Sequence, residues 1–281
     1  MKLSRCGPPG HERPCVIDAH GQRRDASHIA TDWNHDWFAG GGLARLAGFN
    51  PMRLPLVPSA ERWAPAVARP GKIVAIGLNY RDHAAETKAK IPTEPVVFMK
   101  ATTALCGPYD DIQLPRDSRH TDWECELGIV IGSTAKYLAT PADARATIAG
   151  WVLAHDVSER HWQKDRGGQW DKGKSFDTFC PLGPWLVTSD ELPEPTPIAL
   201  ETDVDGVAKQ RGSTADMIFA PFTIVHYLSQ CMTLEPGDVI CTGTPAGVGM
   251  GRNPPEFLRH GQTVELRAGP LGSQRSRVVQ G

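Results

Sequence analysis

From Lys72 onward the chain alternates short β-rich runs with turn residues, and no other feature of the sequence limits its fold as strongly. Runs of this length, separated by Gly, Pro and Asp, are typical of β-strands. The predicted strands are Lys72–Gly77, Cys125–Ile131, Trp151–Ala154, Trp185–Thr188, Ile198–Val204, Asp238–Thr242 and Gln262–Arg267. The predicted helices are Tyr80–Lys90, Pro141–Ala149 and Phe222–Met232. Because strands outnumber helices, we predict an α+β fold.

The N-terminal region differs from the rest of the chain, because it scatters Gly, Pro and His among only short hydrophobic segments. Prolines are frequent over residues 51–70, as is typical of a linker. A chain of 281 residues also exceeds the usual length of one domain. We therefore predict a small N-terminal domain and linker over residues 1–70, followed by a larger domain over residues 71–281.

Composition and charge argue against several classes of partner. A formal charge of -2, from 30 basic and 32 acidic side chains, provides no positive field for a nucleic acid. The longest apolar runs are far shorter than the roughly 20 residues that cross a bilayer, and residues 1–10 lack the apolar core of a secretory signal. The 7 cysteines form no C-x-x-C pair, as expected of reduced thiols. We therefore expect a cytoplasmic protein without a nucleic acid or membrane partner.

An acidic segment, Asp122-Trp-Glu-Cys-Glu-Leu-Gly-Ile-Val-Ile-Gly132, passes directly into a buried-strand pattern. Side chains on a strand alternate between its faces, so Glu124 and Glu126 point the same way and lie within reach of one ion. A second strand-like run ends in Asp156, which offers a third carboxylate. Such oxygen ligands suit Mg²⁺ or Mn²⁺ better than zinc. On spacing alone, a solvated strand end with surface partners remains the alternative.

Two further groups of polar residues have helical spacing. His83 and Glu86 lie three residues apart in a predicted helix, so the carboxylate could orient the imidazole as a general base. Arg160 and Gln163 follow Asp156 by four and seven residues, which places all three on one side if the chain is helical there. The alternatives are an exposed helix with ordinary polar residues and, for the second group, surface salt bridges.

Six motifs occur together in the order and spacing of one enzyme family. They are Ile76-Gly-Leu-Asn-Tyr-Arg-Asp-His83, Phe98-Met-Lys100, Trp123-Glu-Cys-Glu-Leu127, His155-Asp-Val-Ser-Glu-Arg160, Gly173-Lys-Ser-Phe-Asp-Thr-Phe179 and Thr242-Gly-Thr-Pro-Ala-Gly-Val-Gly249. On these motifs the chain resembles the fumarylacetoacetate hydrolase family over about residues 72–268, as an acylpyruvase-like member. Trp123 stands where relatives usually carry Tyr, and Glu159 where a small residue is common, so both could reshape the pocket.

The resemblance implies a fold, an assembly and a set of site residues. The fold would be a mixed β-roll with a small N-terminal β-rich domain, and the assembly a homodimer. The implied residues are Glu124, Glu126 and Asp156 as ligands of Mg²⁺ or Mn²⁺; His83 and Glu86 as a water-activating pair on a lid; Arg160, Gln163 and Lys174 as donors to an oxyanion and a substrate carboxylate; and Lys100, Gly243 and Thr244 as substrate contacts. A plain hairpin is the alternative for the Thr242–Gly249 loop, and a surface salt bridge for Lys174.

These residues together imply a reaction. A divalent ion can chelate an α-keto acid, polarise its carbonyl and stabilise an enolate. With water activated beside it, the expected reaction is hydrolysis of a C–C bond in a 2,4-dioxo acid, either an acylpyruvate or a 2,4-diketo-3-deoxy sugar acid. Oxaloacetate decarboxylation, hydroxydienoate isomerisation and ureidoglycolate cleavage remain open as alternatives. A catalytically silent binding protein on the same scaffold is the alternative from another class.

Overall fold

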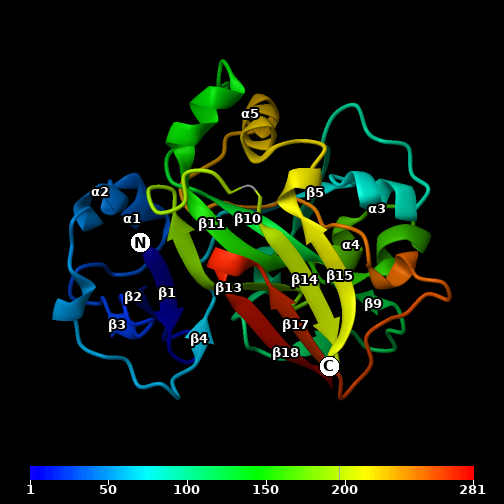
Figure 1. The fold of residues 1–281 in the computed structure, drawn as a ribbon, viewed down its shortest axis with the longest axis horizontal. Coiled ribbons are helices and arrows are strands. Elements are labelled where there is room, and N and C mark those ends of the chain that lie inside the picture. Colours follow the sequence, from blue (N-terminus) through cyan, green and yellow to red (C-terminus); the bar gives the residue numbers. More distant parts are fainter. Residues whose placement is uncertain (196) are drawn as a thin grey trace.

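The computed structural model describes residues 1–195 and 197–281, which form two main β-sheets with a few short helices (Figure 1). Over this part of the chain the larger sheet has 11 strands, and its main path runs β3-β2-β1-β13-β11-β10-β16-β5-β6, with β4 beside β1 and β7 beside β13. The strands of the larger sheet are β1 (Lys2–Cys6), β2 (Arg13–Ile17), β3 (Arg23–Asp25), β4 (Trp63–Ala64), β5 (Ile73–Gly77), β6 (Val96–Lys100), β7 (Leu105–Cys106), β10 (Cys125–Ile131), β11 (Ile148–His155), β13 (Cys180–Thr188) and β16 (Val239–Cys241). The fold is α+β, as predicted.

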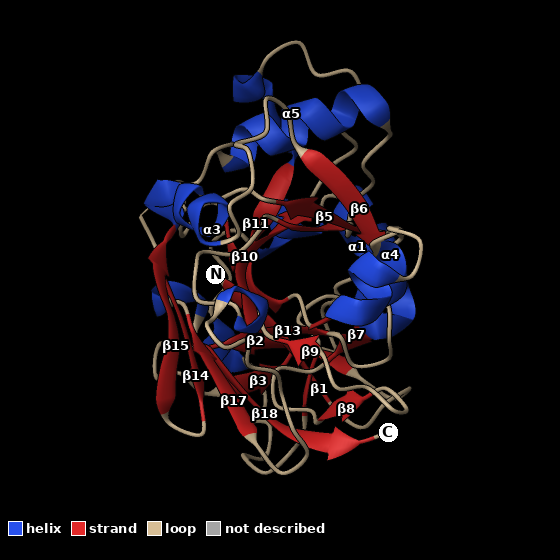
Figure 2. Cartoon of the chain, turned by 90° about the vertical axis from the view of Figure 1, so that its right-hand side faces the viewer, coloured by secondary structure: helices blue, strands red, loops and turns tan. Residues whose placement is uncertain are grey.

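The smaller sheet lies beside the larger one, and its strands β14, β15, β17 and β18 run together along one side of the molecule in Figure 2. Its order is β15-β14-β17-β18-β8. Its strands are β8 (Ile112–Leu114), β14 (Ala199–Val204), β15 (Val207–Ser213), β17 (Thr263–Arg267) and β18 (Ser273–Gln280). A short ladder of β9 (Thr121–Asp122) and β12 (Ser158–Glu159) lies near the cavity described below.

Each of the seven predicted strands contains or overlaps an observed strand, but the polar strands β15 and β18 were not predicted. β18 alternates buried and exposed positions, yet its inward residues include Gln274 and Ser276. Gln274 donates from its side-chain amide to the carbonyl oxygens of Leu153 and Gly183, at 2.9 and 3.0 Å. Tertiary hydrogen bonds therefore stabilise this buried face, and an apolar pattern cannot reveal it.

The helices are short. They are α1 (His35–Ala39), α2 (Gly42–Leu46), α3 (Arg81–Glu86), α4 (Asp171–Lys174) and α5 (Pro221–Cys231), together with a π-helical turn (His161–Asp165). 3₁₀ turns are Pro51–Arg53, Thr102–Ala104, Pro141–Thr147, Thr214–Asp216, Gly249–Gly251 and Gly269–Leu271. None of the helices described in residues 1–195 and 197–281 combines the length and apolar character needed to span a bilayer.

Two helix predictions need correction. α3 ends at Glu86, where prediction extended it to Lys90. Residues Pro141–Thr147 form a 3₁₀ helix, and the chain enters β11 at Ile148. The third prediction is confirmed, because α5 carries the apolar face expected of it and lies across the end of the molecule beyond β5, β6 and β11 (Figure 2).

The N-terminal strands extend the larger sheet. β1 pairs antiparallel with β13, with Leu3 opposite Leu186. Trp33, Trp37 and Phe38 are buried in the same hydrophobic core as the central strands. The predicted boundary near residue 70 therefore separates segments that share a sheet, and an independently folding N-terminal domain remains a prediction.

Candidate active site

The three carboxylates predicted to bind a metal converge at the end of one ladder of the larger sheet. β10 pairs with β11 so that Cys125 lies opposite His155, which brings the neighbouring residues Glu124 and Asp156 side by side. The Asp156 N–H donates to the Glu124 carbonyl oxygen at 3.0 Å. Glu126 follows on the same face of β10 as Glu124. One carboxylate oxygen from each of the three residues lies within 4.8 Å of the others.

All three carboxylates are buried, so the alternative of a solvated strand end does not fit. The exposed fractions of Glu124, Glu126 and Asp156 are 6%, 1% and 1%. Burial raises the pKa of Glu126 well above its usual range, and the negative charges of Asp156 and Glu124 raise it further. A divalent cation would relieve this repulsion, and carboxylate oxygens are ligands that Mg²⁺ and Mn²⁺ prefer. The residues present therefore fit such an ion.

Two buried lysines lie directly against the carboxylates. Lys174 Nζ donates to Glu124 Oε2 at 2.8 Å and to Asp156 Oδ2 at 2.6 Å. Lys100 Nζ donates to the other Asp156 oxygen, also at 2.6 Å. Burial acts to lower the pKa of Lys174, but Asp156 and Glu124 outweigh it and raise the pKa, so this side chain stays charged. The family resemblance implied that both lysines lie in the pocket. The structure puts each one beside Asp156, but Lys174 lines the cavity there and Lys100 does not.

Arg160 and Gln163 lie on the other side of Glu124. Arg160 Nη2 pairs with Glu124 Oε1 at 2.7 Å, and Arg160 Nε donates to Asp122 Oδ2 at 2.8 Å. Arg160 Nη1 donates to Gln163 Oε1 at 3.0 Å. Both side chains are buried, so surface salt bridges do not describe them. Burial acts to raise the pKa of Glu124, but Lys174 and Arg160 outweigh it and hold the pKa below its usual value.

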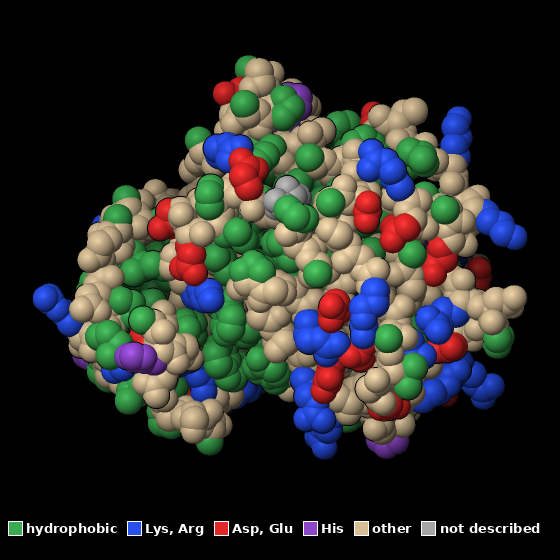
Figure 3. All heavy atoms as spheres, viewed as in Figure 1, with side chains coloured by type: hydrophobic (Ala, Val, Ile, Leu, Met, Phe, Trp, Pro, Cys, Tyr) green, Lys and Arg blue, Asp and Glu red, His purple; other side chains and the backbone are tan. Residues whose placement is uncertain are grey.

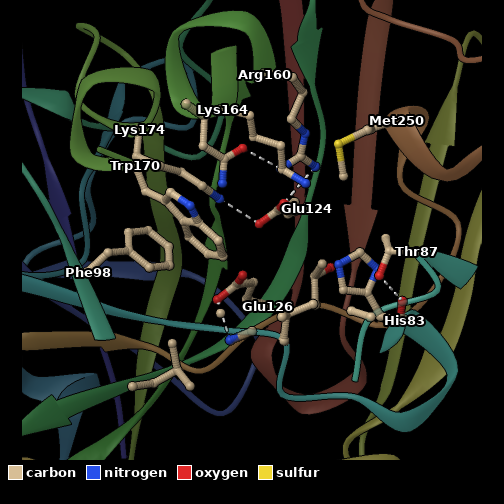
Figure 4. A pocket seen from close by; sticks show the side chains of 17 residues that line it. His83, Thr87, Phe98, Glu124, Glu126, Arg160, Lys164, Trp170, Lys174 and Met250 are labelled. Carbon is tan, nitrogen blue, oxygen red and sulfur yellow. Dashed lines mark hydrogen bonds and ion pairs between the residues drawn. The ribbon is translucent and has the colours of Figure 1, made fainter. Parts of the chain in front are cut away.

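A cavity of about 130 Å³ lies beside these groups (Figure 4). Its lining residues are Ile76, Gly77, Leu78, His83, Thr87, Ala89, Phe98, Glu124, Glu126, Arg160, Gln163, Lys164, Trp170, Lys174, Gly243, Thr244 and Met250. Figure 4 shows Phe98 and Trp170 on one side and His83 on the other, with Glu124 and Glu126 between them. The arrangement follows from the fold, because α3 and α4 lie on opposite sides of β10 in Figure 2.

The predicted pair on α3 is present. His83 Nδ1 lies 3.2 Å from Glu86 Oε2, and His83 is only 7% exposed. The other Glu86 oxygen accepts the N–H of Gly247 at 2.9 Å. Because Nδ1 faces Glu86, Nε2 is the ring nitrogen available for proton transfer. His155 has no comparable arrangement: burial, followed by the charge of Lys100, lowers its pKa to about 3, so this imidazole is neutral.

The predicted substrate contacts in the Thr242–Gly249 loop, Gly243 and Thr244, form hydrogen bonds within the protein. The Gly243 N–H donates to Glu126 Oε2 at 2.8 Å. Thr244 Oγ1 donates to the Cys125 carbonyl oxygen at 2.9 Å and accepts from Gln210. These donors bind groups of the protein itself. Gly243 and Thr244 do line the cavity, and their contact with a substrate remains a prediction.

Several residues around the cavity were not predicted as site residues. Asp122, Lys164, Trp170 and Met250 are examples, and Phe98 was quoted only as part of a motif. Asp122 opens the acidic segment, so its position was a usable signal. Phe98 lies on β6, whereas Lys164, Trp170 and Met250 reach the cavity from turns with no local pattern.

Comparison with known proteins agrees with this geometry. Residues 72–279 match the family described as fumarylacetoacetate (FAA) hydrolase C-terminal. A Burkholderia ambifaria protein whose name says hydrolase is 53% identical over 275 residues, which cover 98% of this chain and 97% of that protein. The chain belongs to the fumarylacetoacetate hydrolase family, whose members are enzymes that act on small molecules.

Solved structures share the whole fold. The fumarylacetoacetate hydrolase of Exiguobacterium antarcticum has a TM-score of 0.86 and 34% identity, with 100% of both chains covered. A 2-hydroxyhepta-2,4-diene-1,7-dioate isomerase from Mycobacterium marinum has a TM-score of 0.76 and 32% identity, covering 100% of this chain and 98% of that one. Maleylpyruvate hydrolase from Sphingobium sp. SYK-6, in complex with manganese(II) and pyruvate, has a TM-score of 0.81 and 25% identity, with 100% of both chains covered.

Proposed function

We propose that this protein hydrolyses a C–C bond in a 2,4-dioxo acid of the acylpyruvate or 2,4-diketo-3-deoxy sugar acid type. The proposal assigns Glu124, Glu126 and Asp156 as ligands of Mg²⁺ or Mn²⁺. One observation carries it: Glu124, Glu126 and His83 line a single cavity, with Asp156 beside the two glutamates and Glu86 beside His83. The manganese and pyruvate bound by the maleylpyruvate hydrolase relative support it.

The charges around the carboxylates suit a keto acid bound with a divalent ion. The acidic side chains of this set are Asp122, Glu124, Glu126 and Asp156, and the basic side chains are Lys100, Arg160 and Lys174. With every group ionised, this set has an excess of one negative charge. A divalent ion would change it to one positive charge, which a substrate carboxylate would neutralise. An ion there would also polarise the substrate's keto group and stabilise negative charge on its oxygen.

The chain's own residues would remove the proton from water and stabilise the oxyanion that develops on the substrate. In the proposed reaction His83 Nε2 removes a proton from water, which adds to the carbonyl carbon distant from the substrate carboxylate, while Glu86 holds Nδ1. The C3–C4 bond then breaks, its electron pair passes to the keto acid half, and protonation of C3 gives pyruvate or a substituted pyruvate. The other half leaves as a carboxylic acid. Lys174 and Arg160 offer fixed positive charge to the developing oxyanion.

Isomerisation of a hydroxydienoate is the second candidate. It is favoured by the fold shared with the Mycobacterium marinum isomerase. An isomerase moves a proton within its substrate and consumes no water. Incorporation of ¹⁸O from labelled water into the released acid therefore separates the two reactions.

Two wider features belong to the same proposal. We infer a homodimer, as the family resemblance implies, which light scattering on the purified protein would test. We also infer a cytoplasmic location, supported by cysteines that are all free in the structure. Fractionation of cells that express the full chain checks the location.

The reaction is tested with a substrate panel. Acylpyruvates, 2,4-diketo-3-deoxy sugar acids, oxaloacetate, ureidoglycolate and a hydroxydienoate are incubated with Mg²⁺, with Mn²⁺ and with chelator. We expect metal-dependent release of pyruvate or its derivative from a 2,4-dioxo acid, and a preference between the two ions identifies the metal. Turnover of only oxaloacetate, ureidoglycolate or a dienoate would contradict the proposal. Bound metal with no turnover of any compound would favour a silent binding protein.

A further inference from the structure

Asp122 is the most highly connected buried carboxylate near the cavity that the proposed mechanism does not use. It is 0% exposed. Its Oδ1 accepts the N–H of Gly249 at 2.7 Å, and its Oδ2 accepts the N–H of Met250 at 3.0 Å. The same Oδ2 accepts from Arg160 Nε at 2.8 Å. One carboxylate thus joins the 246–251 loop to the guanidinium that pairs with Glu124.

The other end of this loop binds the lid helix α3. The N–H of Ala246 donates to Asp82 Oδ2 at 3.2 Å, and the N–H of Gly247 donates to Glu86 Oε1 at 2.9 Å. Asp82 also accepts the backbone N–H of His83 at 2.7 Å. Within six residues the loop therefore binds carboxylates of two elements, α3 and β9.

Close packing leaves the loop little freedom to move independently. A Cβ on Gly251 would overlap the Glu86 carboxylate. A Cβ on Gly249 would overlap the Glu256 carbonyl oxygen and lie 2.7 Å from Asp122 Oδ1. Glycine at these positions lets both carboxylates reach the backbone. Residues 249–251 thus pack against both Asp122 and Glu86.

We propose that Asp122 is a positioning residue that couples Arg160 to the lid helix α3 through the 246–251 loop. In this arrangement the loop sets the placement of the His83–Glu86 pair and of Arg160 together. An effect of Asp122 on catalysis rests on the proposed function, because that function assigns Arg160 to the substrate anion and His83 to water. The mechanical coupling does not rest on it.

Asp122→Asn tests the coupling in the full chain loaded with Mg²⁺ or Mn²⁺. The new amide nitrogen is a donor and would face two other donors, Met250 N–H and Arg160. We expect faster hydrogen exchange at the Gly249 and Met250 amides and, through the loop, at Ala246, Gly247 and α3. We also expect the dissociation constant of oxalate, an enolate mimic, to rise about tenfold with metal affinity unchanged.

Asp238→Asn is the matched control. Asp238 is also 0% exposed, accepts the N–H groups of Lys72 and Glu235 at 3.0 and 2.6 Å, and pairs with Lys72 Nζ at 2.7 Å. It does not line the cavity. This variant should lose stability and exchange faster around Lys72 and Glu235, with oxalate affinity unchanged.

Glu86→Ala tests the same coupling from the lid side and covers the case that Asp122→Asn does not fold. Since coupling is reciprocal, the Gly249 and Met250 amides should exchange faster in Glu86→Ala. Unchanged exchange there, or unchanged exchange at Ala246, Gly247 and α3 in Asp122→Asn, would overturn the proposal. Exchange requires no turnover, so this result stands even if no 2,4-dioxo acid proves to be a substrate.

Discussion

The smaller sheet and the end of the β10–β11 ladder are both rich in charge, but they use it in opposite ways. On the smaller sheet, Arg211 and Arg267 both pair with Asp203, and Arg275 pairs with Glu265 at 2.9 Å. Figure 3 shows both signs of charge mixed over this side of the molecule. At the ladder end the carboxylates are buried and crowd one another. Glu126 accepts the Gly243 N–H and forms no ion pair with the residues that the structure describes.

The difference indicates which charges serve function. An exposed ion pair contributes about 0–1 kcal/mol and needs no further explanation. A buried carboxylate with like charges around it is unfavourable unless a ligand or cation compensates it. The surface pairs thus need no bound ligand. The crowding of Glu126 by Glu124 and Asp156, in contrast, supports the proposed bound ion. The following predictions test this contrast, from the largest expected effect to the smallest.

Removing a proposed metal ligand should have the largest effect. Glu124→Ala and Asp156→Ala should abolish turnover and also the rise in melting temperature on adding Mg²⁺ or Mn²⁺, because a ligand stabilises the fold only through binding. The unaltered protein at about 100 times the dissociation constant should gain about 2.7 kcal/mol, and chelator should remove it. Full activity of either variant in excess chelator would refute the ligand assignment.

Removing the proposed base should leave metal binding unchanged. His83→Ala should lower hydrolytic turnover by about 10² to 10⁴ and leave the metal-induced thermal shift unchanged, because His83 contacts Glu86 and not the three carboxylates. Single-turnover kinetics and thermal shift on the same preparation check both parts. An unaltered rate would place the base elsewhere.

Removing one buried cation should weaken anion binding. Lys174→Met deletes the ammonium between Glu124 and Asp156, so we expect the dissociation constant of oxalate to rise about tenfold or more in the metal-loaded protein. Calorimetric titration gives the value. Equal affinity in the variant would remove Lys174 from the anion site.

Removing an exposed cation should have the smallest effect. Arg275→Ala breaks the pair with Glu265, in which the arginine side chain is 68% exposed. We expect a loss of no more than about 1 kcal/mol in unfolding free energy, smaller still at high salt, and unchanged turnover. Urea unfolding at two salt concentrations measures it. A loss of unfolding free energy as large as that expected for a buried charge would contradict the proposed difference between the two regions.

Features that depend on neighbours along the chain could be predicted from the sequence. The β10 strand has the predicted bounds, because Cys125–Ile131 is a continuous apolar run once Glu126 is set aside. Alternation on that strand correctly placed Glu124 and Glu126 on one face. The three-residue spacing of His83 and Glu86 was enough to predict that their side chains would meet.

Features that depend on partners distant in the chain could not be predicted from the sequence. β18 was missed because its inward Gln274 forms its hydrogen bonds with carbonyl groups of the larger sheet. The hydrogen bond from Gly247 of the Thr242–Gly249 loop to Glu86 could not be predicted for a similar reason, since no sequence pattern shows it. Lys164 and Trp170 reach the cavity only because the chain turns back after β12.

The sequence by itself therefore determined the α+β class, the central strands, the family, and which acidic and basic side chains would gather. Each of these follows from local periodicity or from motifs of a few residues. Tertiary structure alone decided that Lys174 lies between Glu124 and Asp156 and that Asp122 joins Arg160 to a distant loop. The reason is physical: ion pairs and hydrogen bonds act over about 3 Å, and only the packing of strands brings such groups within that distance.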